Sequence, residues 1–132
     1  MARNHMTRKE NEELRRQRWM FLYDDRLIST VFPNVERIEI EYEIEHKSIF
    51  GNNKRRDSTA YIPNSKANFF FECLNDECTS FYFDLKNIIY TMVRECNKFV
   101  EGSLNCEGSE APDHMYQRCT GTLTYRISIE YK

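Results

Sequence analysis

The sequence is poor in glycine and proline and has no long apolar run. Four Gly and three Pro among 132 residues are too few for a linker-rich or disordered chain. No apolar run approaches the roughly 18 residues that span a bilayer, and the N-terminus has no hydrophobic signal region. We therefore expect a cytoplasmic protein with a single α+β domain over residues 7–132. Because His5-Met6 resembles a cloning junction, residues 1–6 are predicted to be disordered or cloning-derived.

The chain also lacks a large excess of charge of either sign. Its 19 Lys and Arg and 21 Asp and Glu give a net charge of −2, so the whole domain does not attract nucleic acid or an anionic membrane. Two short stretches are nevertheless locally basic, and they are where we would expect nucleic-acid contacts: Arg15, Arg16 and Arg18 in a predicted helix, and Lys54, Arg55 and Arg56 in a predicted loop over residues 51–57. The alternative interpretation is a solvated helix face and a charged hairpin tip.

Two segments show the period-two alternation of half-buried strands. Residues 38–45 alternate apolar and acidic side chains, and residues 123–131 alternate almost as regularly. Shorter strands are predicted at 58–62 and 68–73. We therefore expect an antiparallel sheet of about four to five strands with one charged, solvated face. The glutamates of 38–45 would pair there with cations of neighbouring strands such as Arg126, although a row of carboxylates can also bind a hard cation.

Two helices are predicted to pack on the inner face of this sheet. Thr7 and Glu10 have the spacing of a capping box and start a helix over about 7–23. Asp84 is a good N-cap for a second helix, which we expect to end at Gly102. Its apolar stripe lies at helical spacing and contains Leu85, Ile88, Ile89, Met92, Val93, Cys96 and Val100. Cys96 is therefore predicted to be a buried core thiol.

Four of the five cysteines flank polar turns. Cys73 and Cys78 enclose a four-residue turn directly after a strand, much as in a zinc knuckle, and Cys106 and Cys119 enclose a polar loop before the last strand. In a chain without an export signal such cysteines stay reduced or bind metal. We therefore predict that these four thiols converge on one structural zinc ion.

Other interpretations of the cysteines remain open from sequence. His114 lies in the second loop and is an alternative fourth ligand. Cys73 and Cys78 can instead form a reversible disulfide, although their four-residue gap differs from the redox Cys-x-x-Cys motif. All five cysteines can also be buried as small apolar side chains.

Three segments together resemble a known group of proteins. They are residues 16–28, residues 71–85 with Cys73 and Cys78, and the region from Cys106 through Cys119 to the closing strand at 125–131. Their combination resembles a family of small bacterial proteins of unknown function with two Cys pairs, similar to zinc ribbons. The resemblance implies that the two Cys pairs and the closing strand belong together. It implies no activity and no catalytic residues.

No recognisable catalytic motif accompanies the cysteines. Asp24-Asp25 is a paired carboxylate, and His46 and His114 are the candidate general bases, but none has a nucleophile beside it. We therefore expect a zinc-stabilised interaction module whose partner is a protein or a nucleic acid, and not a membrane. An enzyme with an unrecognised site is the alternative. An aromatic content of 14% also fits a homo-oligomer, whose interface would cover the excess.

Overall fold

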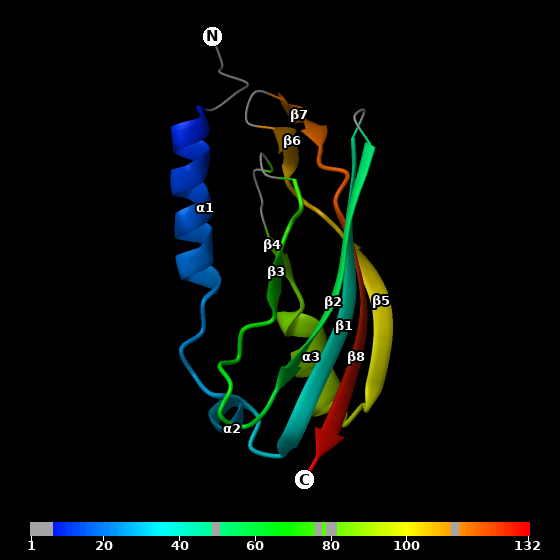
Figure 1. Ribbon diagram of the computed structural model, residues 1–132. Coiled ribbons are helices and arrows are strands. Elements are labelled where there is room, and N and C mark those ends of the chain that lie inside the picture. The colour runs from blue at the N-terminus through cyan, green and yellow to red at the C-terminus, as the bar shows by residue number, and fades with distance from the viewer. Residues whose placement is uncertain (1–6, 49–50, 76–77, 79–81, 112–113) are drawn as a thin grey trace.

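The computed structural model describes residues 7–48, 51–75, 78, 82–111 and 114–132, and it has the α+β fold that the sequence predicts (Figure 1). The predicted N-terminal extension, residues 1–6, lies outside the described residues. The elements in chain order are α1 (Arg8–Leu22), α2 (Ile28–Val31), β1 (Val35–Ser48), β2 (Gly51–Tyr61), β3 (Phe70–Glu72), β4 (Tyr82–Asp84), α3 (Lys86–Arg94), β5 (Phe99–Asn105), β6 (Ser109–Ala111), β7 (His114–Arg118) and β8 (Thr122–Tyr131).

The main sheet is antiparallel and has the strand order β2-β1-β8-β5. Its centre is the long β1–β8 pair, in which Ile40 lies opposite Ile127 and Ile38 opposite Ile129. These side chains are buried because the alternation places every second residue on the inner face. The two alternating segments of the sequence are therefore the two central strands, as predicted.

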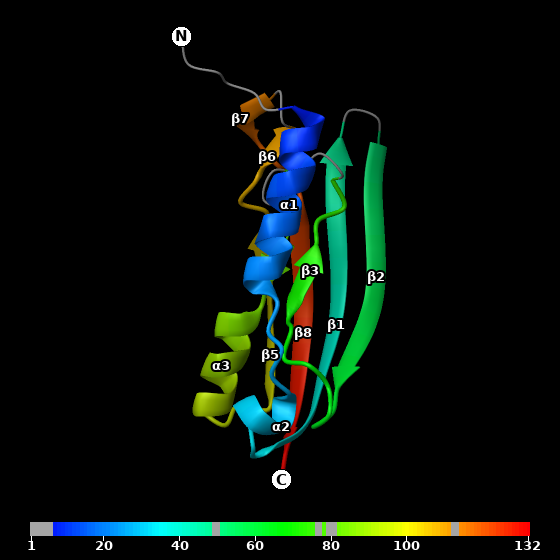
Figure 2. The same ribbon diagram turned by 90° about the vertical axis from the view of Figure 1, so that its left-hand side faces the viewer.

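Two smaller units cover the inner face of the sheet (Figure 2). The β3–β4 hairpin packs on it through Phe71, whose ring centroid lies 4.4 Å from that of Tyr42 in β1. Helix α3 packs beside the hairpin and buries Ile89 and Met92. Helix α1 forms an outer layer over the hairpin and buries only Asn11.

The outer face of the sheet is a ladder of paired charges. Glu43 accepts hydrogen bonds from Arg56 (2.6 Å), and Glu45 pairs with Lys54 at 3.1 Å. Glu41 lies 4.0 Å from Arg126 on the other side. The glutamate row is therefore the solvated face of β1, partnered by cations from β2 and β8, as the sequence predicts.

The expected second helix is shorter than its apolar stripe. Helix α3 ends at Arg94, and Val100 lies in β5, which the sequence analysis missed. Cys96 is exposed, so its assignment to the core was wrong. It has φ 55 at the position after the helix cap, while Asn97 N–H donates to the Met92 carbonyl (2.8 Å). This is a Schellman motif, whose usual glycine is replaced here by cysteine.

The basic residues 54–56 lie in strand β2 and not in a hairpin loop. β1 and β2 pair from Ile38 and Tyr61 as far as Ser48 and Gly51, so the turn between them falls earlier than expected. The cross-strand pairs of Glu43 and Glu45 favour this register because they place opposite charges side by side. The aromatic strand expected at 68–73 is also shorter and spans Phe70–Glu72.

The first helix agrees with its predicted start. Thr7 is the N-cap of α1, and its hydroxyl accepts a hydrogen bond from the Glu10 backbone N–H (3.1 Å).

Within the described residues, no helix combines the length and the apolar character needed to cross a membrane.

Ile127 provides a test of the central β1–β8 pair. Its side chain is 0% exposed, so Ile127→Ala should lower the free energy of unfolding by about 2–5 kcal/mol through lost burial and an unfilled cavity. Ser128→Ala, on the exposed face of the same strand, is the matched control and should change it by no more than about 0.5 kcal/mol. Urea denaturation measures both. Equal effects of the two substitutions would contradict this packing.

Candidate metal centre

Four buried cysteines from distant parts of the chain meet at one end of the main sheet. Their sulfur atoms all lie within 4.8 Å of one another. Cys73 follows β3 directly, and Cys78 lies between β3 and β4. Cys106 follows β5, and Cys119 lies just before β8. The structure thus brings together the four cysteines that the sequence analysis singled out, and they lie close enough to bind a metal ion.

The sulfur spacing fits a tetrahedral metal site. Cys73 Sγ lies 3.7 Å from Cys119 Sγ, and Cys78 Sγ lies 3.2 Å from Cys106 Sγ. A tetrahedron with metal–sulfur bonds of about 2.3 Å has sulfur atoms about 3.8 Å apart. Both separations are far above the roughly 2.05 Å of a disulfide bond, and all five cysteines are free. The four thiols therefore surround one centre and do not form two cross-links.

Backbone hydrogen bonds hold three of these four cysteines in place. Cys106 N–H donates to the Gly121 carbonyl (2.8 Å), which joins the end of β5 to the start of β8. Cys119 N–H donates to the Gly108 carbonyl (2.9 Å). Cys78 N–H donates to the Asn75 carbonyl (3.1 Å) and closes the turn after Cys73. The ligand positions are therefore fixed by the fold and not only by a bound ion.

Two N–H groups point at the sulfur of Cys119. The Asn75 side-chain amide lies 3.6 Å from it, and the backbone N–H of Gly121 lies 3.4 Å from it. Donors of this kind stabilise a thiolate, and ligands of bound metals commonly have such outer partners. The hydrogen bond to Cys119 also explains how the polar side chain of Asn75 can be buried. The sequence analysis missed both residues, although Gly121 stands only two positions after Cys119.

Hydrogen bonds among the four thiols shift the pKa values of three of them in opposite directions. Hydrogen bonds donated by Cys106, and then by Cys73 and Cys78, hold the pKa of Cys119 well below its usual range. The hydrogen bonds with Cys106, followed by those with Cys119 and Cys78, raise the pKa of Cys73. The contact with Cys119 is the largest cause that raises the pKa of Cys106. These shifts have opposite directions because the four thiols share one set of hydrogen bonds, and a cation among them would favour the charged form of each.

Gly121 leaves room for the sulfur atoms. A Cβ added there would lie 2.7 Å from Cys73 Sγ and 3.3 Å from Cys106 Cβ. Both are below the separation of ordinary van der Waals contact, so no larger residue fits without moving a ligand. The close approach of this backbone to the cluster therefore depends on glycine.

The two aspartates considered for chemistry have structural partners. Asp24 pairs with Arg26 at 2.8 Å, and the hydrogen bonds from Arg26 lower the pKa of Asp24 to about 2. Asp25 pairs with Lys66 at 2.5 Å. Both carboxylates therefore stabilise the turn after α1. His46 is buried in β1, and His114 lies in β7, where the structure describes the backbone alone.

The six basic residues proposed for nucleic-acid contact do not form one surface. Arg15, Arg16 and Arg18 belong to α1 and the other three to β2, and the two elements lie on opposite sides of the β3–β4 hairpin (Figure 1). Arg15 pairs with Glu72 at 2.9 Å, and Arg16 with Glu13. Arg55 lies 3.7 Å from Asp57.

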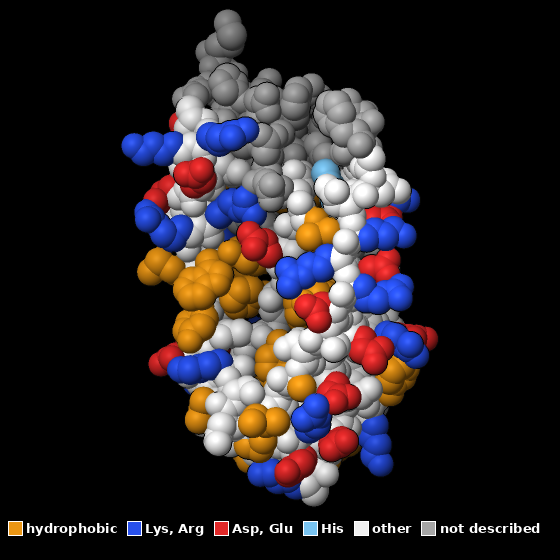
Figure 3. Space-filling view, viewed as in Figure 1, with side chains coloured by type: hydrophobic (Ala, Val, Ile, Leu, Met, Phe, Trp, Pro, Cys, Tyr) orange, Lys and Arg blue, Asp and Glu red, His pale blue; other side chains and the backbone are white. Residues whose placement is uncertain are grey.

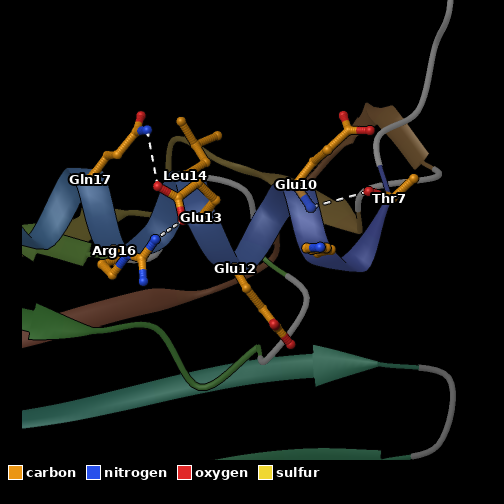
Figure 4. Close-up of a pocket in the computed structure, with 8 residues that line it drawn as sticks. Thr7, Glu10, Glu12, Glu13, Leu14, Arg16 and Gln17 are labelled. Atoms are coloured by element: carbon orange, nitrogen blue, oxygen red, sulfur yellow. Dashed lines mark hydrogen bonds and ion pairs between the residues drawn. The ribbon is translucent and has the colours of Figure 1, made fainter.

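One hollow lies along the first turns of α1, and the described side chains that line it include none of the cysteines (Figure 4). Its volume is about 840 Å³. The described side chains that line it belong to α1 and its N-cap: Thr7, Lys9, Glu10, Glu12, Glu13, Leu14, Arg16 and Gln17. Glu13 accepts hydrogen bonds from both Arg16 and Gln17. The polar side chains of this hollow therefore form hydrogen bonds with one another. The described residues that line it include no cysteine or histidine.

Comparisons with protein-family models, curated proteins and solved structures found no match to this chain. The resemblance to small bacterial proteins with two Cys pairs therefore stays a prediction. The case for the metal centre depends on its geometry.

Gly121→Ala should weaken metal binding by about 10–100-fold, because the new methyl group displaces the Cys73 or Cys106 ligand. Competition with a chromophoric chelator measures the affinity. Ser128→Ala is the control, because Ser128 is exposed in the strand β8 that follows Gly121 and lies away from the cysteines. Equal affinity in the two variants would contradict the close approach of Gly121 to the ligands.

Proposed function

We propose that this protein is an interaction module whose fold is stabilised by one zinc ion bound to Cys73, Cys78, Cys106 and Cys119. The observation that carries the proposal is the convergence of four buried sulfur atoms within 4.8 Å. Four thiolates with tetrahedral spacing are a common ligand set of structural zinc sites. Iron also accepts four thiolates, so the test below distinguishes the two metals.

A structural role follows from the closed ligand set. Four sulfur ligands complete a tetrahedron and leave no position for water or substrate. All four cysteines are also buried, so a substrate has no direct path to the ion. The site would therefore contribute binding free energy to the folded state, as structural zinc does in small domains.

The exposed surface supports a role in binding. Several large apolar side chains are exposed on α1 and its C-terminal cap: Trp19, Met20, Phe21 and Tyr23. Clustered exposed apolar side chains commonly mark protein contact sites. The charges of Lys54 and Arg56 are compensated by Glu45 and Glu43, and that of Arg15 by Glu72. A protein partner therefore fits this surface better than a phosphate backbone, which leaves nucleic-acid binding as the second proposal.

Metal and thiol content of the purified protein test the proposal directly. We expect one zinc ion per chain by elemental analysis. We also expect a single fast-reacting thiol, because only Cys96 of the five cysteines is exposed. Chelation should release four more thiols, and Cys96→Ser should remove only the fast reaction. Absence of metal, or five equally reactive thiols in the native protein, would contradict the proposal, and bound iron would contradict the choice of zinc.

Loss of the metal should loosen one part of the molecule more than the rest. Chelation should speed amide hydrogen exchange by about tenfold or more in the β3–β4 hairpin, whose three-residue strands have little other support. The centre of β1 and β8 should stay protected because the cysteines meet at one end of the sheet, beyond the last pair of these strands, Glu45 and Thr122. Mass spectrometry of peptides measures both. Equal changes in the hairpin and in the central strands would show that the metal does not act locally.

A further inference from the structure

A stripe on α1, formed by Met20 and Phe21 with Arg16 and Gln17 beside them, faces away from the rest of the protein. Phe21 is 87% exposed and Met20 68% exposed. Arg16 and Gln17 precede them by one helical turn, so the four side chains lie on one face of the helix. The opposite face of α1 contacts the body of the protein, and Asn11 on that face is buried. Figure 3 shows apolar side chains gathered over the C-terminal half of α1.

The body-facing side of α1 is already occupied. Arg15 pairs with Glu72 of β3 at 2.9 Å, and Arg18 and Leu22 line a hollow of about 320 Å³ against β4, α3 and β5. Trp19 stacks on Tyr23 with ring centroids 4.9 Å apart, which braces the end of the helix. The stripe of Arg16, Gln17, Met20 and Phe21 is therefore held in a fixed orientation toward solvent.

The charged side chains around this stripe can pair with the same side chains of a second copy of the chain. Arg16 lies four residues before Met20, and Asp24-Asp25 lies four and five residues after it. Asp24 and Asp25 follow directly after Tyr23, the C-cap at which the chain leaves the helix. When two copies pair antiparallel about a two-fold axis at Met20, Arg16 of each copy would lie toward the end of α1 that these two residues follow in the other copy. Asp25 is the available carboxylate, because its side chain is 85% exposed. The pairs of Arg16 with Glu13 and of Asp25 with Lys66 are surface pairs, which contribute little and can exchange partners.

We propose that this stripe binds a second copy of the same chain, with α1 antiparallel to α1 of the partner. A two-fold interface requires a surface that is complementary to itself, and this charge pattern meets that requirement. Aromatic side chains bury about 150–250 Å² each. Two stripes with their flanking Trp19 and Tyr23 would bury roughly 1,000 Å², the low end of specific interfaces. The dimer is therefore weak and depends on concentration.

The inference rests on the proposed role of the domain in binding, and it names the partner. It does not depend on the identity of the metal. Metal content is measured in every sample described below, so a failure of dimerisation with metal retained is distinguished from a failure of the metal centre.

Sedimentation equilibrium of the metal-loaded protein between about 1 μM and about 500 μM tests the proposal. We expect a reversible monomer–dimer equilibrium. Phe21→Ser should raise the dissociation constant at least about tenfold, as loss of an anchor residue does. Phe99→Ser is the matched control, because Phe99 is also exposed (50%) but lies on the outer face of β5. It should leave the equilibrium unchanged.

Charge reversal distinguishes this arrangement from non-specific association. Arg16→Glu and Asp25→Lys should each weaken the dimer, because like charges then face each other twice. An equimolar mixture of the two variants should restore association, since both contacts then join opposite charges.

Three outcomes would overturn the proposal. The first is a chain that stays monomeric throughout this concentration range, including one that binds anionic lipid vesicles through α1 instead. The second is a dimer that Phe21→Ser leaves intact, or that Phe99→Ser weakens equally. The third is a mixture of the charge variants that associates no better than either variant alone.

Discussion

The convergence of four sulfur atoms is the constraint on which one end of this fold depends, where β5 ends and β8 begins. The cysteines come from both sides of the β3–β4 turn and from the adjoining ends of β5 and β8, so the cluster joins the short hairpin to the main sheet. An isolated hairpin with strands of three residues is marginal in water. A shared metal ion would supply the free energy that so short a hairpin cannot supply alone.

The remainder of the fold has a different source of stability. The β1–β8 pair buries isoleucines on one face and neutralises its glutamates on the other, so its packing and its electrostatics favour the same register. Helix α1 depends on both parts. Its Arg15 contacts Glu72, the residue directly before Cys73, so the metal centre would indirectly orient the helix that carries the exposed apolar stripe.

Period-two alternation and cysteine spacing made the central strands and the cysteine cluster predictable from the sequence. The Schellman motif at Cys96 was not predictable, because the motif usually has glycine there and the apolar stripe continues across it to Val100. The second half of β2 was predicted as a strand at 58–62, but residues 51–57 were interpreted as a loop because they are polar on both faces and only pairing with β1 reveals the strand. Asn75 and Gly121 lie close to the cysteine sulfurs only in the folded protein. Their positions in the sequence alone therefore do not identify them as neighbours of the cluster.

X-ray absorption at the metal edge of the purified protein tests the central claim most directly, because it counts the ligands of the bound ion. From the proposed zinc site we expect a zinc edge with four sulfur ligands at about 2.3 Å and no nitrogen or oxygen ligand. A shell with fewer than four sulfurs, or one completed by imidazole or water, would contradict a closed site formed by Cys73, Cys78, Cys106 and Cys119.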